Sequence, residues 1–136
     1  MEVKAKASYI RISPRKVRLV VDVIRGLSVA RARQQLRVMN KAAARPVLKL
    51  LESAIANAEH NFHLSSEQLF VKSVAADSGP TLRRWTPKAF GRSAPIRKRT
   101  THISLSLIEQ AVTNESAKKE RIEKKKTKKV NKTVKK

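Results

Sequence analysis

A long segment without acidic residues constrains the fold of this chain more than any other feature. No Asp or Glu lies between Asp77 and Glu109. Glycine and proline recur inside this segment, at Gly79, Pro80, Pro87, Gly91 and Pro95. A structureless loop of this length is uncommon in a chain of 136 residues, which is enough for one ordinary domain. Residues 78–100 are therefore predicted to form a β-hairpin that extends beyond the body of the domain, with its tip near residues 88–92.

Strand patterns occur on both sides of this hairpin. Residues 69–76 are typical of a strand, and residues 101–107 alternate plainly between two faces, so the two segments can pair antiparallel. A weaker alternation predicts a further strand over residues 3–12. In that strand, Lys4 and Lys6 face away from Val3, Ala5 and Ala7.

A first helix is expected directly after residue 12. Ser13 is a frequent helix cap, and Pro14 suits the first helical position, where its missing N–H has no partner in any case. Gly26 is typical of a helix end. Apolar residues recur at helical spacing in between, at Val17, Val20, Val21 and Ile24. The other side is basic, with Arg15, Lys16, Arg18 and Arg25, and Asp22 is expected to pair with Arg18 or Arg25.

Two more helices are predicted before residue 63. Ser28 can cap the second, whose apolar side is Val29, Ala32, Leu36 and Met39. Asn40 can cap the third, while Pro46 either begins its regular part or kinks its first turn. This third helix has a continuous apolar stripe of Val47, Leu51, Ala54, Ile55, Ala58 and Phe62. The expected fold is therefore α+β, with about three helices packed on a small antiparallel sheet and a long protruding β-hairpin.

The domain and a basic tail differ in composition. Residues 1–112 are expected to form one globular nucleic-acid-binding domain that includes the hairpin 78–100. Residues 115–136 hold 11 Lys or Arg, 3 acids and very few large apolar side chains. Such a segment cannot bury enough surface to offset the entropy of ordering it. Residues 113–136 are thus expected to be a disordered tail, which either becomes helical on a polyanion or only adds solvation.

The charge of the chain indicates a polyanionic partner. The 32 Lys and Arg against 10 Asp and Glu give a net charge of +22, whereas a small soluble domain usually carries roughly 2 to 8 charges. Self-repulsion on this scale has to be offset by a polyanion. Basic residues interleaved with aromatic ones, as in the hairpin, suit contact with phosphates and bases together. The hairpin candidates are Arg83, Arg84, Trp85, Lys88, Arg92, Arg97, Lys98 and Arg99.

Histidines, cysteines and acids point to no catalytic, metal or cofactor site. The chain has no Cys, and His60 and His63 beside Glu59 lack a third ligand at suitable spacing. No close pair of acids suggests acid/base catalysis, and no Gly-rich phosphate loop is present. His102 lies on the polar face of its strand, where it either hydrogen-bonds phosphate or ribose or faces solvent. No apolar run is long enough to predict a membrane span or an export signal.

Three blocks of the sequence resemble a known family. The first runs from Arg11 through the residues SPRKVRLV at 13–20 to Ile24-Arg25-Gly26, and the second is ESAIANAEHN at 52–61. The third comprises Gly79-Pro80, Arg84, Pro87-Lys88-Ala89, Gly91-Arg92 and IRKRTTHI at 96–103. Together they closely resemble the universal large-subunit ribosomal protein number twenty-two family, of bacterial type. The likeness spans about residues 1–110, and the Lys-rich C-terminal tail is an addition to it.

This resemblance implies a fold, partners and site residues. The body would lie on the outer face of the large subunit, and the hairpin would reach inward through 23S-type rRNA. The implied partners are this rRNA, which is bound early in assembly, neighbouring large-subunit ribosomal proteins and the nascent polypeptide. No membrane, cofactor or self-oligomer is expected, and the location would be the cytoplasmic ribosome. The tip that lines the exit tunnel would be Lys88, Ala89, Phe90, Gly91 and Arg92.

Further residues follow from the resemblance. Leu82, Arg83 and Arg84 would lie on the part of the hairpin that this family associates with macrolide response. The rRNA-binding set would include Arg11, Arg15, Lys16, Arg18, Arg25 and His102 beside the hairpin candidates. Phe90 is not a residue that the family pattern requires at the tip.

Two alternatives from other functional classes remain. A DNA-compacting protein also fits the net charge and the Lys-rich tail, since architectural proteins can use basic β-arms. An enzyme with a basic substrate cleft would need an acid/base or metal constellation, which the sequence does not contain. A structural rRNA-binding protein with no reaction of its own is the favoured interpretation.

Overall fold

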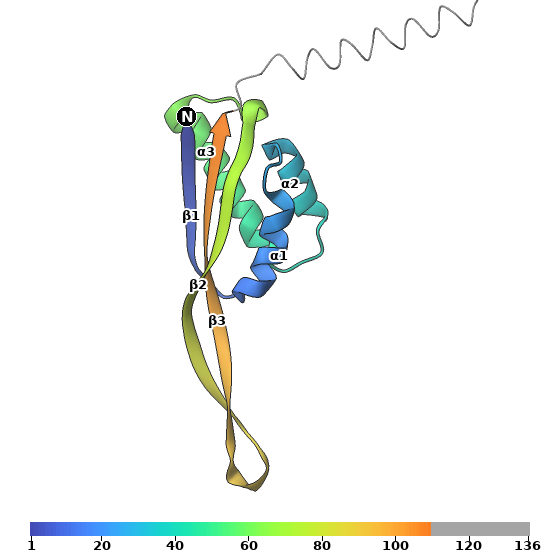
Figure 1. The fold of residues 1–136 in the computed structure, drawn as a ribbon, viewed down its shortest axis with the longest axis vertical. Helices are drawn as coiled ribbons and strands as arrows, with labels where there is room; N and C mark the ends of the chain where they lie inside the picture. Colours follow the sequence, from blue (N-terminus) through green and yellow to red (C-terminus); the bar gives the residue numbers. More distant parts are fainter. Residues whose placement is uncertain (110–136) are drawn as a thin grey trace, which may run out of the picture.

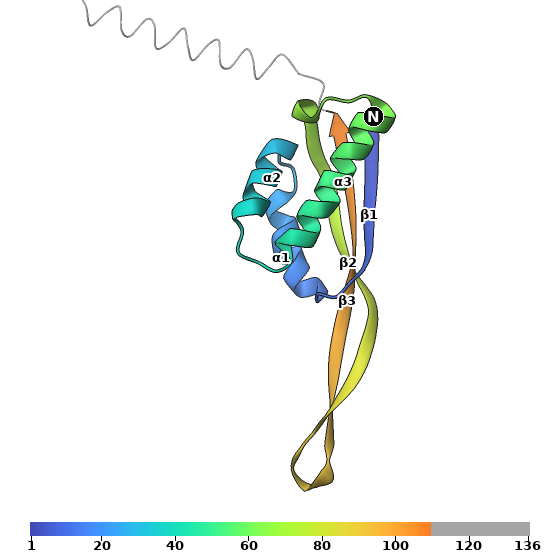
Figure 2. The same cartoon turned by 180° about the vertical axis from the view of Figure 1, so that it is seen from behind.

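The computed structural model describes residues 1–109 of the 136-residue chain. Three helices cover one face of a three-stranded antiparallel sheet, and two of the strands continue far beyond the body as a twisted hairpin (Figures 1 and 2). The predicted α+β class with a protruding hairpin is confirmed. The tail predicted for residues 113–136 lies outside the described residues.

The two longest strands of the sheet are neighbours, and one of them is the central strand while the other is an edge strand. Strand β1 is Glu2–Ile10, β2 is Leu69–Pro87 and β3 is Ser93–Glu109, in the order β1-β3-β2. The strands predicted at residues 69–76 and 101–107 and the hairpin predicted between them form one continuous strand pair. Strands β2 and β3 remain hydrogen-bonded from Leu69↔Glu109 to Pro87↔Ser93. The pairing register shifts between Ser78 and Thr81, where the body ends and the hairpin begins.

The core lies between the helices and one face of this sheet. Alternate residues of each strand face this core. The neighbours Val3, Leu107 and Val71 on the three strands are buried in it, while Lys4, Ser106 and Ser73 lie on the opposite face of the sheet. Each fully buried aliphatic side chain contributes roughly 1.5–3 kcal/mol. The largest are Val17, Val20, Val21, Ile24, Val47, Leu51, Leu69, Val71, Ile103, Leu105 and Leu107.

The first two helices follow the predicted pattern with one correction. Helix α1 is Pro14–Ile24 and α2 is Val29–Val38, and each buries its predicted stripe except Met39, which follows α2 and is partly buried. Ser13 precedes α1, but its side chain makes no capping hydrogen bond. Its backbone carbonyl instead accepts the N–H groups of Lys16 and Val17, at 3.0 and 3.3 Å.

The third helix begins later than Asn40, so Asn40 as its cap was wrong. Helix α3 is Ala44–Phe62, and Pro46 stands in its first turn, where a proline costs no intrahelical hydrogen bond. Phe62, predicted in the apolar stripe, is 42% exposed. The helix ends there because His63 adopts the left-handed conformation, with φ 54°. Leu50, which the stripe omitted, is buried. A short 3-10 turn, η1 (Ser66–Gln68), leads into β2.

Candidate nucleic-acid interface

The hairpin beyond the body, here called the arm (residues 80–99), contains no buried side chain. Its two strands pair from Thr81↔Arg99 to Pro87↔Ser93, and a short 3-10 turn, η2 (Ala89–Gly91), forms the tip. The predicted tip at residues 88–92 is confirmed as the turn of the hairpin. Since no buried core supports the arm, its two strands are held together mainly by backbone pairing.

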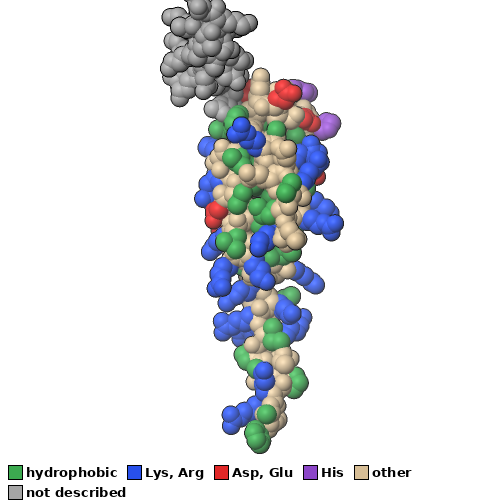
Figure 3. All heavy atoms as spheres, turned by 90° about the vertical axis from the view of Figure 1, so that its right-hand side faces the viewer, with side chains coloured by type: hydrophobic (Ala, Val, Ile, Leu, Met, Phe, Trp, Pro, Cys, Tyr) green, Lys and Arg blue, Asp and Glu red, His purple; other side chains and the backbone are tan. Residues whose placement is uncertain are grey.

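Charges on the arm repel one another. Arg83 lies directly opposite Arg97 in the strand register, and like charges in such a pair are destabilising. In residues 1–109 the ion pairs are Asp22–Arg25, Arg33–Glu52 and Glu2–Lys72, all of which lie in the body. Figure 3 shows the blue side chains along the arm, while the red ones lie only on the body. The arm is therefore cationic along its length, and residues 80–99 contain no acidic side chain that could offset this charge.

A basic groove joins the arm to the body. This groove, here called the neck groove, has a volume of about 610 Å³ and lies between the start of α1 and the base of the arm. Arg11, Ser13 and Lys16 line it from the body side. The arm contributes Leu82, Arg84, Arg97, Lys98 and Arg99. Residues about 70 to 90 positions apart in sequence thus form one cationic hollow that suits a phosphodiester backbone.

Two aromatic side chains extend this surface toward the tip. Trp85 is 65% exposed on one strand, and Phe90 is 99% exposed in the tip. Phe90 has φ 59° and is followed by Gly91 with φ 68°, so both residues adopt the left-handed conformation. The N–H of Lys88 donates to the carbonyl of Arg92 at 2.8 Å and closes the turn. Exposed aromatic faces of this kind can stack on unpaired bases.

The neck depends on close packing around Gly79. The Thr100 hydroxyl donates to the carbonyl of Pro80 at 2.7 Å, and the Thr101 hydroxyl donates to that of Ile12 at 2.5 Å. A Cβ at Gly79 would overlap the Thr100 hydroxyl oxygen and lie 3.0 Å from Nε2 of His102. These contacts fix where the arm leaves the body. Sequence reasoning missed their role, although Gly79-Pro80 marked the position.

His102 is held within the neck. Its Nδ1 accepts the N–H of Tyr9 at 3.2 Å, and the two rings meet edge to face with centroids 4.8 Å apart. Tyr9 has φ 60° at the irregularity in β1 that lies between Ala7 and Ile10. His102 therefore makes contacts that neither of the two predicted alternatives included. The signal for this role lies in tertiary packing, because Tyr9 is 93 residues away in sequence.

The predicted basic residues in and directly after α1 have two different environments. Arg18 Nε donates to the carbonyl of Ala76 at 3.1 Å, and Arg25 donates to that of Val74 at 3.3 Å. Arg25 also pairs with Asp22 at 2.9 Å, which decides between the two predicted partners of this acid. Arg18 and Arg25 thus bind the edge of β2, whereas Lys16 lines the neck groove and Arg15 is exposed.

The described residues offer neither a metal cluster nor a membrane span. In residues 1–109 no three His, Cys, Asp or Glu side chains gather as metal ligands. Among the same residues, no helix has both the length and the apolar character that a membrane crossing requires.

Known proteins are similar in sequence to this chain over the body and the arm. The model of the family described as Ribosomal protein L22p/L17e matches residues 5–108. The protein named Large ribosomal subunit protein uL22 of Chloroflexus aggregans is 51% identical over 111 residues, which are 82% of this chain and 98% of that relative. Its namesake in Macrococcus caseolyticus is 52% identical over 112 residues, 82% of this chain and 90% of the relative.

A third relative of the same name, from Desulfitobacterium hafniense, is 51% identical over 109 residues, 80% of this chain and 96% of the relative. The family match includes all three helices, the whole of β2, β1 from residue 5 onward, β3 up to residue 108, and the whole arm. The resemblance inferred from the three sequence blocks is confirmed. The chain belongs to the Ribosomal protein L22p/L17e family.

Proposed function

We propose that the arm and the neck groove bind large-subunit rRNA of the 23S type, and that the tip lines the nascent-polypeptide exit tunnel. Membership of the family makes the chain a structural, non-enzymatic component of the large ribosomal subunit, in contact with rRNA and with neighbouring ribosomal proteins. Binding early in assembly and contact of the tip with the nascent chain are part of the same proposal. Residues 1–112 would act as one rRNA-binding unit.

The observation that carries this proposal is the neck groove together with the bare, cationic arm. Residues 80–99 carry seven basic side chains and no acid, and none of their side chains is buried. In water alone, the repulsion between Arg83 and Arg97 is unrelieved. Phosphates on either side of the arm would attract both arginines, which offsets this repulsion, and would release counterions from the RNA. The arm is thus suited to a channel within folded RNA rather than to an open surface.

Contacts of two kinds would give affinity and fit. The proposed phosphate-binding residues are Arg11, Arg15, Lys16, Arg18, Arg25, Arg83, Arg84, Lys88, Arg92, Arg97, Lys98 and Arg99. Trp85 would stack on a base, which contributes roughly 1–3 kcal/mol. His102 remains a proposed contact through Nε2, since Nδ1 is occupied by the N–H of Tyr9. If about eight cations meet phosphates, the logarithm of affinity falls with that of salt at a slope of roughly −6.

The tip has a distinct part in this proposal. Lys88, Ala89, Phe90, Gly91 and Arg92 would lie at the tunnel wall, where the nascent chain passes. Leu82, Arg83 and Arg84 would lie on the adjoining arm, in the part that the family resemblance relates to macrolide response. The fully exposed ring of Phe90 supports a contact there, because an unpartnered aromatic side chain in water gains by burial.

Sedimentation of a cell lysate through a sucrose gradient after a high-salt wash tests the proposal. We expect the chain to comigrate with the large subunit, because an arm enclosed by rRNA helices cannot leave by ion exchange alone. Treatment with RNase should release it, and treatment with DNase should not. Release by salt into the light fractions, or comigration with DNA, would favour the DNA-compacting alternative and overturn the proposal.

A further inference from the structure

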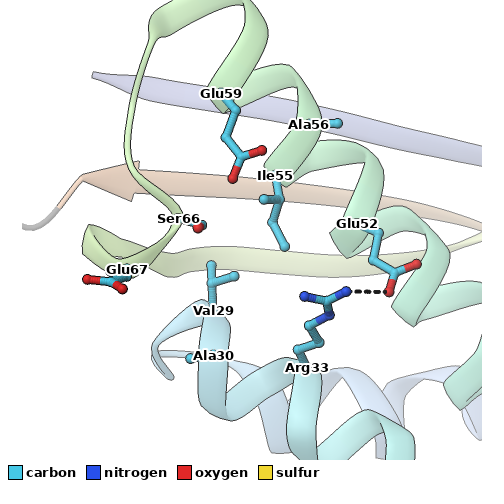
Figure 4. Close-up of a pocket in the computed structure, with 9 residues that line it drawn as sticks. All are labelled: Val29, Ala30, Arg33, Glu52, Ile55, Ala56, Glu59, Ser66 and Glu67. Atoms are coloured by element: carbon cyan, nitrogen blue, oxygen red, sulfur yellow. Dashed lines mark ion pairs between the residues drawn. The ribbon is translucent and has the colours of Figure 1, made fainter.

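A second groove lies on the body, away from the arm. It has a volume of about 440 Å³ and is formed by α2, α3 and the η1 turn (Figure 4). Its apolar floor includes Val29 from α2 and Ile55 from α3, whose side chains point toward one another in Figure 4. We call it the body groove. None of the proposed rRNA-binding residues lines it.

The rim of the body groove is acidic in a protein that is otherwise basic. Residues 1–109 hold 21 basic and 7 acidic side chains, and three of those seven acids, Glu52, Glu59 and Glu67, line this one groove. Glu52 pairs with Arg33 at 3.5 Å. Glu59 and Glu67 are exposed, and neither has an ion-pair partner within residues 1–109. The carboxylates of Glu59 and Glu67 at the rim can therefore bind an external cation.

These features select a basic polypeptide as the occupant. Phosphates would meet repulsion from Glu59 and Glu67, so RNA does not suit the groove. The side chains of Lys and Arg combine an aliphatic stem with a cationic end, and the stem packs on apolar surface while the charge stays at the rim. The floor of Val29 and Ile55 matches such a stem, and the carboxylates match the charge.

We propose that the body groove docks a Lys- or Arg-bearing segment of a neighbouring protein of the large subunit. The stem of one basic side chain would lie on Val29 and Ile55, and its charge would reach Glu59 or Glu67. This inference rests on the proposed function, because it places the chain in the large subunit. It adds the surface through which the body contacts protein rather than RNA.

Charge reversal in the full-length chain tests the docking. The variants Glu59→Lys and Glu67→Lys are expressed as the sole copy, and large subunits are purified after a salt wash. Quantitative mass spectrometry should show one other protein depleted at least tenfold in both variants. Glu109→Lys is the matched control, since Glu109 is an exposed acid outside the groove and its replacement changes the charge equally. That control should retain the complete set of proteins.

Carbodiimide cross-linking of subunits with the unchanged chain provides a second measurement. It joins carboxylates to lysines in direct contact, so Glu59 or Glu67 should link to a lysine of another protein. The Glu2–Lys72 pair, at 3.2 Å, is an internal positive control. Either the depletion or this cross-link supports the inference. A complete set of proteins without such a cross-link, or with cross-links only to this chain's own lysines, overturns it. A chain that does not comigrate with the large subunit at all would instead refute the proposed function.

Discussion

The body and the arm are built on the same two strands, yet only the body covers them with helices. In the body, alternate residues of β2 and β3 pack against α1, α2 and α3, so that Val71 and Leu107 are fully buried. Beyond Gly79 the same strands have both faces in solvent. An isolated two-stranded hairpin is at best marginally stable in water. The comparison indicates that the buried core stabilises the body in the free chain, whereas the arm has no core and, in the proposed function, is stabilised by rRNA.

The largest effect is expected from removing the arm. Residues 84–96 are replaced by Asn-Gly, which suits a two-residue hairpin turn between the paired residues Arg83 and Arg97. Affinity for 23S-type rRNA should fall by about 100-fold or more, since three cations and the stacking of Trp85 are lost. The body should still melt cooperatively with nearly the same midpoint in circular dichroism. Loss of cooperative melting would mean that the arm belongs to the core.

A pair of single substitutions sharpens the same contrast. Leu51→Ala creates a cavity in the core and should lower the free energy of unfolding by about 2–5 kcal/mol. Trp85→Ala, on the exposed arm, should leave the free energy of unfolding within about 0.5 kcal/mol of the unchanged chain. Urea denaturation measures both. For rRNA binding, in contrast, Trp85→Ala should weaken affinity. A large loss in the free energy of unfolding of Trp85→Ala would contradict the division between body and arm.

Basic residues at the base of the arm should control the salt dependence of binding. Replacement of Arg97, Lys98 and Arg99 by Ser should reduce the slope of log affinity against log salt by about 2 to 3 in magnitude. A control variant removes the same charge from exposed residues of α2 and α3, at Arg31, Arg37 and Lys49. Filter binding at several salt concentrations compares the two. An equal change in slope would show that net charge, and not the neck groove, determines binding.

The neck connects the two regions, and Gly79→Ala tests how rigidly. The added methyl group would overlap the Thr100 hydroxyl, so we expect a loss of about 1–3 kcal/mol in the free energy of unfolding. Combining it with Thr100→Ala removes the overlapping oxygen and should recover part of this loss. Thr100→Ala alone is the control for the lost hydrogen bond to Pro80. Additive losses in the double variant would show that the two residues do not compete for space.

The smallest expected effect concerns the edge of the body. Lys72 donates a hydrogen bond to Glu2 at 3.2 Å, and this bond lowers the pKa of the Glu2 carboxyl below its ordinary value. Stabilisation by the ionised form is therefore present above the ordinary Glu pKa of about 4.3 and is lost as pH falls through the lowered value. Glu2→Gln should lower the urea midpoint slightly at pH 7 and leave it unchanged in strong acid. Glu109→Gln is the control, and a larger effect in acid than at pH 7 would reverse the expected sign.

Much of the fold was predictable because local patterns and tertiary packing agree. The helix stripe from Val17 to Ile24 and the strand alternation around Ile103 both place apolar residues on one face, and both faces are buried. Predictions failed where local signals compete. Asn40 and Ser13 are good caps in general, but the chain starts α3 at Ala44 and uses only the Ser13 backbone at α1. Phe62 matches the stripe, yet the helix ends at this residue.

Among the candidate site residues, the sequence by itself determined which are basic or aromatic, and that those from Arg83 to His102 lie in a segment without acids. Charge is a property of composition, so the need for a polyanion could be inferred directly. The family resemblance came from three blocks of residues, at 11–26, 52–61 and 79–103. Only the tertiary structure decided which of these residues face the same space. It joins Arg11 and Lys16 to Arg97 in the neck groove, directs Arg18 and Arg25 to β2 carbonyls, and holds His102 against Tyr9. The physical reason is that such contacts depend on strand register and helix placement, which arise from packing of the whole core rather than from neighbours in sequence.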